Sequence, residues 1–305
     1  MSAHKSSFHR VTDLSKSDVQ SLFQTAKQIK QTQEFPQLSA GVVGLVFLEN
    51  STRTRLSFEV AAKKMGLQTM LLQNDNTSSL SKGESLIDTI ETVLAMKPGA
   101  LVVRHSDAEL AGYLKEMVSV PVINAGEGAV AHPTQALLDA FTLQEKFEDL
   151  SGKKLVIVGD VLHSRVASSN KKLLEFLGME VSVCCPKEMF PANSDLWKGA
   201  KHFVDMAEAI KDSDVVMVLR VQSERHNGFS FNESDYVRDY RFEKKHLSLM
   251  SEGQVLLHPG PYVPGKDMQS EVLGDKRSLV RTQVENGVYV RAALLAKILG
   301  ESCRI

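Results

Sequence analysis

Short apolar runs rich in β-branched residues alternate with helical patterns along this chain of 305 residues, and this alternation limits the folds that it can adopt. Val42 to Leu48 precedes a predicted helix that ends near Gly66, and Leu155 to Val158 precedes one that stops at Gly178. Strands that are apolar throughout are buried on both faces, as in parallel sheets covered by helices. The pattern therefore predicts an α/β protein built on doubly wound parallel sheets.

The length and a restart of the alternation predict two domains. A chain of this length favours about two domains. A helix is expected to open at Pro133, a favourable first-turn residue, and to run toward Phe147, after which the alternation begins again. The expected division is domain one at 1–134, domain two at 135–287 with 135–149 as an interdomain helix, and a last helix within 288–305 packing back on domain one. Ligands of such proteins bind at the carboxyl ends of strands and between domains, so we expect the active site in the cleft between the two domains.

The charge balance and the cysteines exclude several classes of function. Lys and Arg number 36 against 37 Asp and Glu, a net charge of −1, which argues against a nucleic-acid-binding surface. No apolar run approaches the ~18 residues of a membrane helix, and no secretory signal pattern occurs. Cys184, Cys185 and Cys303 form neither a disulfide framework nor a zinc pattern. We therefore expect a cytoplasmic protein without nucleic-acid or membrane partners.

The first candidate site lies between the first predicted strand and its helix, from Glu49 to Arg55. Ser51 or Thr52 can cap the helix. Arginines in a first turn oppose the helix dipole, whereas a bound phosphate would reverse this penalty by accepting hydrogen bonds from backbone N–H groups, hydroxyls and a guanidinium. The alternative is an ordinary cap with one solvated and one salt-bridged arginine. Neither a GxxxxGK[ST] motif nor a dinucleotide fingerprint occurs, so nucleotide hydrolysis and hydride transfer lose support.

Three motifs, in this order, make the sequence resemble the carbamoyltransferases over essentially its whole length. They are STRTRLSFE at 51–59, HPTQALLD at 132–139 and HPGP at 258–261. The run LRVQ at 219–222, followed by Glu224 and Arg225, is similar to the aspartate branch of that family. The resemblance implies transfer of the carbamoyl group of carbamoyl phosphate to the amine of L-aspartate, giving N-carbamoyl-L-aspartate and phosphate, an early step of pyrimidine synthesis. We expect no metal and no cofactor, because no metal-binding spacing occurs and the amine can attack directly.

The resemblance also implies where the phosphate group binds. Four residues of the first motif would hold it: Ser51, Thr52, Arg53 and Thr54. Arg55 is expected to be structural. A serine and a lysine of the neighbouring subunit complete the pocket in this family, and they correspond to Ser79 and Lys82, which implies a homotrimer with shared active sites. From the sequence alone, the segment around Ser79 and Lys82 is only a polar loop.

The resemblance assigns stabilisation of the carbonyl oxygen to Thr54, Arg104 and His132. Arg104 ends a predicted strand, and His132 stands just before the helix that opens at Pro133. The dipole of that helix disfavours a charged imidazole, so we expect a neutral His132 that donates one hydrogen bond. Without the resemblance, a capping or core histidine is an equal alternative.

The remaining expected site residues bind the carbamoyl amino group and the acceptor. The amino group would be held by Gln135 and by backbone carbonyls near Gly260 and Pro261. The two carboxylates of aspartate require guanidinium groups, which match their geometry. The aspartate pocket is therefore expected to contain Arg165, Arg220 and Gln222. Alone, either arginine would be a surface ion pair.

The resemblance is incomplete after Pro261, where the family often places an arginine and this chain has Tyr262 to Gly265. Lys266 cannot reproduce a guanidinium fork. The polar segment 223–245 is expected to be a mobile loop that closes over aspartate.

Two other functions remain open. One is a carbamoyltransferase for another amine such as ornithine, although that branch would show a cysteine-containing motif instead of HPGP. The other is a non-catalytic homologue that binds phosphate ligands and regulates a partner enzyme. Catalytic trimers of this family stand alone or join other chains, so a regulatory chain or a dihydroorotase partner is also open.

Overall fold

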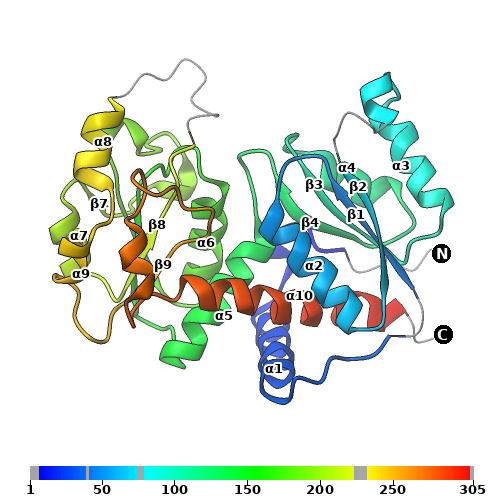
Figure 1. Cartoon of the computed structure of the whole chain (residues 1–305), viewed down its shortest axis with the longest axis horizontal. Coiled ribbons are helices and arrows are strands. Elements are labelled where there is room, and N and C mark those ends of the chain that lie inside the picture. Colours follow the sequence, from blue (N-terminus) through cyan, green and yellow to red (C-terminus); the bar gives the residue numbers. More distant parts are fainter. Residues whose placement is uncertain (1–6, 39–40, 74–78, 223–231, 303–305) are drawn as a thin grey trace. The chain divides into compact units, whose positions relative to one another are not determined.

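The computed structural model describes residues 7–38, 41–73, 79–222 and 232–302, which form two units, each with its own parallel sheet (Figure 1). Unit 1 comprises Met1–Thr134 and Glu285–Ile305, and unit 2 comprises Gln135–Val284. The predicted fold class, α/β with two doubly wound parallel sheets, is confirmed. None of the helices in the described ranges is both long and apolar enough to span a bilayer.

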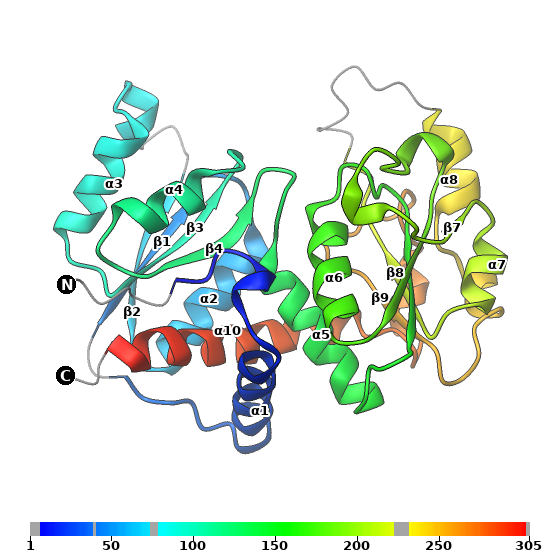
Figure 2. The same ribbon diagram turned by 180° about the vertical axis from the view of Figure 1, so that it is seen from behind.

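Unit 1 contains a four-stranded parallel sheet in the order β2-β1-β3-β4. Its strands are β1 (Val42–Phe47), β2 (Gln68–Gln73), β3 (Ala100–His105) and β4 (Val122–Glu127). Figures 1 and 2 show α3 (Leu86–Ala95) and α4 (Leu110–Met117) on one face, and α2 (Thr52–Lys64) and α10 (Val280–Ser302) on the other. The internal strands β1 and β3 are mainly apolar because both faces of the sheet are covered: Val46, Leu101 and Val103 are buried in the cluster that includes α3 and α4.

The last helix, α10, contacts two other helices of unit 1. The Arg291 guanidinium lies 5.2 Å from the centre of the Phe58 ring of α2. Lys297 Nζ lies 2.8 Å from Oδ1 of Asp18 in α1 (Lys16–Thr32). The helix begins at Val280, before the expected residue 288, because its first turns are mostly polar and carry no apolar period.

Unit 2 contains a five-stranded parallel sheet in the order β7-β6-β5-β8-β9. Its strands are β5 (Lys154–Val158), β6 (Glu180–Cys184), β7 (His202–Phe203), β8 (Val215–Val218) and β9 (Val255–Leu257). Helix α5 (Pro133–Phe147) begins at the predicted residue. Helix α6 (Arg165–Phe176) lies on one face of the sheet, and α7 (Met206–Lys211), α8 (Glu233–Tyr240) and α9 (Lys244–Leu247) lie on the other (Figures 1 and 2).

The polar segment 223–245, expected to be a mobile loop, contains the helix α8 (Glu233–Tyr240). Residues 223–231 lie outside the described ranges, and the expectation is wrong for α8. Asn232 caps this helix by accepting hydrogen bonds from the backbone N–H groups of Ser234 and Asp235. Tyr236 and Tyr240 are buried, so two aromatic anchors one turn apart outweigh the polar composition.

Candidate functional site

The loop after β1 delivers the STRTR residues to the first turn of α2. Ser51 occupies the N-cap position, but its side chain accepts no capping hydrogen bond within the described part of the chain, contrary to the expectation for this residue. The first turn carries no acidic side chain. Thr52 and Arg53 are exposed, whereas Thr54 is buried. The result is a helix N-terminus whose N–H groups, hydroxyls and one exposed guanidinium suit an anion.

Thr54, Arg104 and His132, which the sequence places far apart, converge in unit 1. Thr54 Oγ1 lies 3.3 Å from His132 Nε2, and Arg104 Nη1 lies 3.4 Å from the same nitrogen. All three residues are at least nine-tenths buried. Two donors and one imidazole are therefore held together at the carboxyl end of the sheet, as an oxyanion-stabilising set requires.

Strand register explains how Arg104 reaches this cluster. Arg104 pairs with Phe47 across β1 and β3, and its carbonyl accepts a hydrogen bond from Leu48 N–H at 2.9 Å, which brings the loop after β1 alongside. The pairing of β3 with β4 shifts register at Arg104, and its Nη1 donates to Ala125 O at 3.3 Å. Such irregularities redirect side chains beside functional sites. Glu49 Oε1 lies 3.3 Å from Arg104 Nη2 and further fixes the guanidinium.

The remaining residues expected to bind carbamoyl phosphate, Ser79, Lys82 and Gln135, lie in a short 3₁₀ turn and in α5. Ser79 and Lys82 occupy a 3₁₀ turn, η2 (Ser79–Lys82), where Lys82 is exposed. Gln135 belongs to unit 2, where its Nε2 donates to Asp139 Oδ1 at 2.9 Å.

The aspartate-pocket residues follow β5 and β8 in unit 2. Arg165 is the first residue of α6 and is buried, with Ser164 capping the helix. Gln222 is held by two contacts: its N–H donates to Asp160 Oδ2 at 3.1 Å, and its Nε2 donates to His163 O at 2.9 Å. Asp160 Oδ1 also lies 2.7 Å from His163 Nδ1. Asp160 therefore links the segment before Arg165 to the segment that carries Gln222.

Arg220 is half-buried in the same run, beside a buried carboxylate. Asp267 accepts hydrogen bonds from Val221 N–H at 3.1 Å and from Val263 N–H at 2.7 Å, which ties the RVQ run to the loop after HPGP. Burial raises the pKa of Asp267, while these hydrogen bonds and the charge of Arg220 oppose the rise. The loop of Tyr262 to Gly265, where the family pattern is absent, is thus anchored by Asp267.

The HPGP turn is shaped by its histidine. His258 Nδ1 accepts a hydrogen bond from Gly260 N–H at 2.9 Å, and the Gly260–Pro261 peptide is cis. His258 N–H donates to Gln283 Oε1 at 2.9 Å. The backbone around Gly260 and Pro261 is therefore fixed from both the sheet side and the start of α10.

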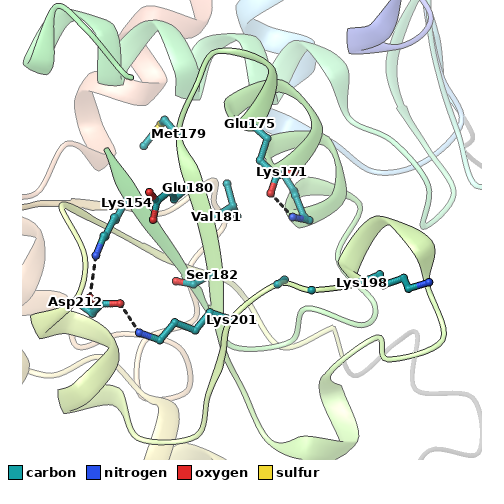
Figure 3. Close-up of a pocket in the computed structure, with 12 residues that line it drawn as sticks. Lys154, Lys171, Glu175, Met179, Glu180, Val181, Ser182, Lys198, Lys201 and Asp212 are labelled. Atoms are coloured by element: carbon teal, nitrogen blue, oxygen red, sulfur yellow. Dashed lines mark hydrogen bonds and ion pairs between the residues drawn. The ribbon is translucent and has the colours of Figure 1, made fainter. Parts of the chain in front are cut away.

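A pocket of about 350 Å³ lies elsewhere in unit 2, at the amino ends of β5 and β6 (Figure 3). Lys154 and Lys201 both pair with Asp212 there, at 3.1 and 2.7 Å. None of the predicted site residues lines this pocket. Only the last two residues of β6 pair with β7, so its first residues form a sheet edge, which lysines commonly protect. Because ligands of parallel sheets bind at the carboxyl ends, we assign this pocket no substrate.

Two family models match the chain, one in each half. The model for the carbamoyl-P binding domain of aspartate/ornithine carbamoyltransferase matches residues 6–145, and the model for the Asp/Orn binding domain matches residues 151–298. The chain belongs to the aspartate/ornithine carbamoyltransferase family. The resemblance expected from the three motifs is therefore confirmed.

Full-length relatives place the chain within the family. The aspartate carbamoyltransferase catalytic subunit of Solibacter usitatus is 40% identical over 296 residues, which cover 95% of this chain and 98% of the relative. The catalytic subunit of M. jannaschii aspartate transcarbamoylase is similar in structure with a TM-score of 0.86 and 28% identity, covering 98% of this chain and 99% of that chain. Ornithine carbamoyltransferase from Pyrococcus furiosus has a TM-score of 0.85 and 27% identity, with the same coverage. The fold is thus common to both branches of the family, and the sequence favours the aspartate branch.

Three carboxylates that support the family motifs were not identified from the sequence. Glu49 holds Arg104, Asp139 holds Gln135, and Asp160 holds the segment of Gln222. Glu49 and Asp139 stand beside and inside a recognised motif, and Asp160 stands two residues after a predicted strand. Their positions in the sequence could have marked them as candidate site residues. Their hydrogen-bond partners could not be predicted, because these depend on strand pairing and helix packing.

Proposed function

We propose that this chain transfers the carbamoyl group of carbamoyl phosphate to the amine of L-aspartate, giving N-carbamoyl-L-aspartate and phosphate in pyrimidine biosynthesis. The observation that carries the proposal is the convergence of Thr54 and Arg104 on one nitrogen of His132, beside the N-terminus of α2. Family membership supports the reaction class, and this cluster supports the site at which the carbonyl is activated.

The phosphate group of carbamoyl phosphate binds at the first turn of α2. Its negative charge interacts favourably with the helix dipole, and its oxygens accept hydrogen bonds from backbone N–H groups and from the side chains of Ser51, Thr52 and Thr54. Arg53 supplies a guanidinium for the same oxygens. Carbamoyl phosphate is thereby held with its carbonyl oxygen toward Arg104 and His132.

Aspartate binds through its carboxylates to Arg165 and Arg220, with Gln222 as an additional polar contact. Arg165 is buried and Arg220 is half-buried, so charge-assisted hydrogen bonds there are shielded from water. Gln135 and the carbonyls of Gly260 and Pro261 accept hydrogen bonds from the carbamoyl amino group, which orients the carbonyl carbon for attack.

The reaction proceeds by direct attack of the amine on the carbamoyl carbon. A C–N bond forms, and the carbonyl oxygen gains negative charge that Thr54, Arg104 and His132 stabilise. The bond from carbon to the phosphate oxygen then breaks, and the amine proton passes to the leaving phosphate. The residues contribute positioning and electrostatic stabilisation, and no covalent enzyme intermediate is required.

The assembly that we propose is a homotrimer in the cytoplasm. Ser79 and Lys82 of one subunit complete the phosphate pocket of its neighbour, and the exposure of Lys82 supports this role. Burial raises the pKa of the Cys184 thiol to about 12, so this thiol is unreactive and suits a reducing compartment.

A carbamoyl-transfer assay without added metal tests the function. The purified chain is supplied with carbamoyl phosphate and either L-aspartate or L-ornithine, and phosphate release is measured together with the carbamoylated product. Product from aspartate alone is expected. Product from ornithine alone would contradict the assignments of Arg165, Arg220 and Gln222, and product from neither would contradict the proposed reaction.

A further inference from the structure

Asp139, a buried carboxylate of α5, holds three amide side chains from three helices. Asp139 has no exposed surface. Its Oδ1 accepts hydrogen bonds from Gln135 Nε2 at 2.9 Å and from Gln283 Nε2 at 2.7 Å. Its Oδ2 accepts one from Asn170 Nδ2 at 2.9 Å. All four residues belong to unit 2, so the network is internal to one unit.

The orientation of the Gln283 amide follows from the backbone. The N–H group of His258 can only donate, and Gln283 Oε1 accepts it at 2.9 Å. The NH₂ group of Gln283 must therefore face the other way, where Asp139 accepts it. The assignment of oxygen and nitrogen in this amide is fixed by its two partners.

The same reasoning fixes the Gln135 amide. Because its NH₂ group donates to Asp139, its Oε1 lies at the opposite end of the amide. A carbamoyl amino group is a hydrogen-bond donor, so it needs that oxygen, and a reversed amide would set one NH₂ group against another.

We propose that Asp139 is a positioning residue, which turns the Gln135 amide so that its oxygen accepts a hydrogen bond from the carbamoyl amino group. This inference rests on the role proposed for Gln135 in carbamoyl transfer. The same carboxylate acts on the HPGP turn, because Gln283 joins it to His258, whose Nδ1 accepts the N–H group of Gly260. One side chain therefore sets two contacts to the same substrate group.

The variant Asp139→Asn tests the orientation. The substituted amide offers one acceptor where the carboxylate offers two, so its NH₂ group faces one of the three amide donors. The Asn170 amide can relieve this contact only by turning over, which gives up its donation to Val166 O at 3.1 Å. We expect kcat/KM for carbamoyl phosphate to fall about tenfold or more. Acetyl phosphate carries a methyl group in place of the amino group, so its inhibition constant as a competitor of carbamoyl phosphate should change by less than about twofold. Equal weakening of both ligands would indicate general loss of packing and would overturn the proposal.

Two further variants separate positioning from folding. Adding Asn170→Asp to Asp139→Asn restores one acceptor for each donor, and kcat/KM should return to within about threefold of the wild type. If Asp139→Asn does not fold, a folded double variant with a tenfold loss would still contradict the proposal. Thr142→Val, which removes a buried hydroxyl that bonds to Leu138 O on the same helix, is the control and should keep the wild-type kcat/KM.

Gln135→Ala distinguishes this inference from the proposed function. Wild-type kinetics in Gln135→Ala would remove the proposed role of Gln135 itself. Impaired Gln135→Ala together with unimpaired Asp139→Asn would leave that role intact and refute the positioning role of Asp139. Loss in both single variants, with little added loss when they are combined, is expected because the two residues act as one unit.

Discussion

At the residue scale, Nε2 of His132 faces two possible donors, Thr54 Oγ1 at 3.3 Å and Arg104 Nη1 at 3.4 Å. A guanidinium only donates, so Nε2 is the acceptor in the Arg104 contact. His132 can donate to a carbonyl oxygen through this nitrogen only in the other tautomer. If carbamoyl phosphate binds as we propose, its binding exchanges these contacts, and Thr54 and Arg104 turn from the imidazole to the substrate oxygen.

Substitutions at Arg53 and His132 test the proposed phosphate and carbonyl contacts. We expect Arg53→Ala and His132→Ala each to lower kcat by at least about tenfold, because each removes a donor to charge on the substrate. Steady-state kinetics on variants with unchanged circular dichroism provide the measurement. Arg55→Ala is the matched control: Arg55 donates to Gln73 Oε1 at 3.2 Å, and its loss should leave kcat within about threefold. Wild-type rates in folded Arg53→Ala would refute its assignment.

His246 makes stability depend on pH. Burial, with a smaller contribution from Lys245, lowers its pKa from 6.5 to about 4, and its Nδ1 accepts the N–H group of Glu243 at 2.9 Å. As the pH falls below 6.5 the unfolded chain takes up the proton first, so the free energy of unfolding decreases until the folded pKa is reached. We expect the wild type to lose about 2 kcal/mol from this group between pH 7 and pH 5.

His246→Asn keeps an acceptor for Glu243 N–H but does not titrate. Urea unfolding at pH 7 and pH 5 should show a smaller decrease for this variant than for the wild type. Equal decreases in the two proteins would show that His246 does not cause the pH dependence.

At the element scale, the sequence predicts the central strands and the long helices but not the short or polar elements. Val42 to Leu48 and Leu155 to Val158 are apolar throughout because β1 and β5 are internal strands, and internal strands carry the strongest signal. Edge strand β2 has polar ends, and β7 has two residues, so neither has a readable period. Residues 233–240, expected as part of a loop, form a helix on two buried tyrosines.

The candidate site is likewise predictable from the sequence only in part. The motif residues and their side of the sheet are predictable, because they follow strands whose carboxyl ends share one edge. The supporting carboxylates are not, because each contact depends on register or packing between distant segments. Glu49 contacts Arg104 because β1 pairs with β3. Asp139 contacts Gln283, which lies in the polar first turns of α10, where the sequence carries no apolar period.

Gly159, which follows β5 and precedes Asp160, tests the junction between strand and site. Its φ of +113° disfavours other residues, and a Cβ would lie 2.6 Å from Tyr236 Oη and 3.3 Å from Leu219 O. We expect Gly159→Ala to lower the free energy of unfolding by about 2 to 3 kcal/mol. Gly253→Ala is the control, since its Cβ would meet nothing within 4 Å, and it should change stability by less than about 0.5 kcal/mol. Equal denaturation midpoints would contradict this account of Gly159.

At the scale of the whole molecule, the shared active sites that we propose have a consequence for mixtures of variants. Lys82→Ala and His132→Ala are each expected to be nearly inactive as pure proteins. If the trimer pairs Lys82 of one subunit with His132 of its neighbour, random reassembly of an equal mixture should restore about one quarter of the sites. The mixture is dissociated, reassembled and assayed, with each variant treated alone as the control. A mixture no more active than its components would contradict site sharing.

The division of the chain into units also affects the order in which they can form. Unit 1 needs both the first part of the chain and Glu285–Ile305, and α10 supplies it with buried residues such as Val290 and Leu294. During synthesis from the amino end, all of Gln135–Val284 leaves the ribosome before those residues do. Unit 1 is therefore the last whose core can close, and the apolar face that α10 covers stays exposed, or bound by a chaperone, until α10 has been synthesised.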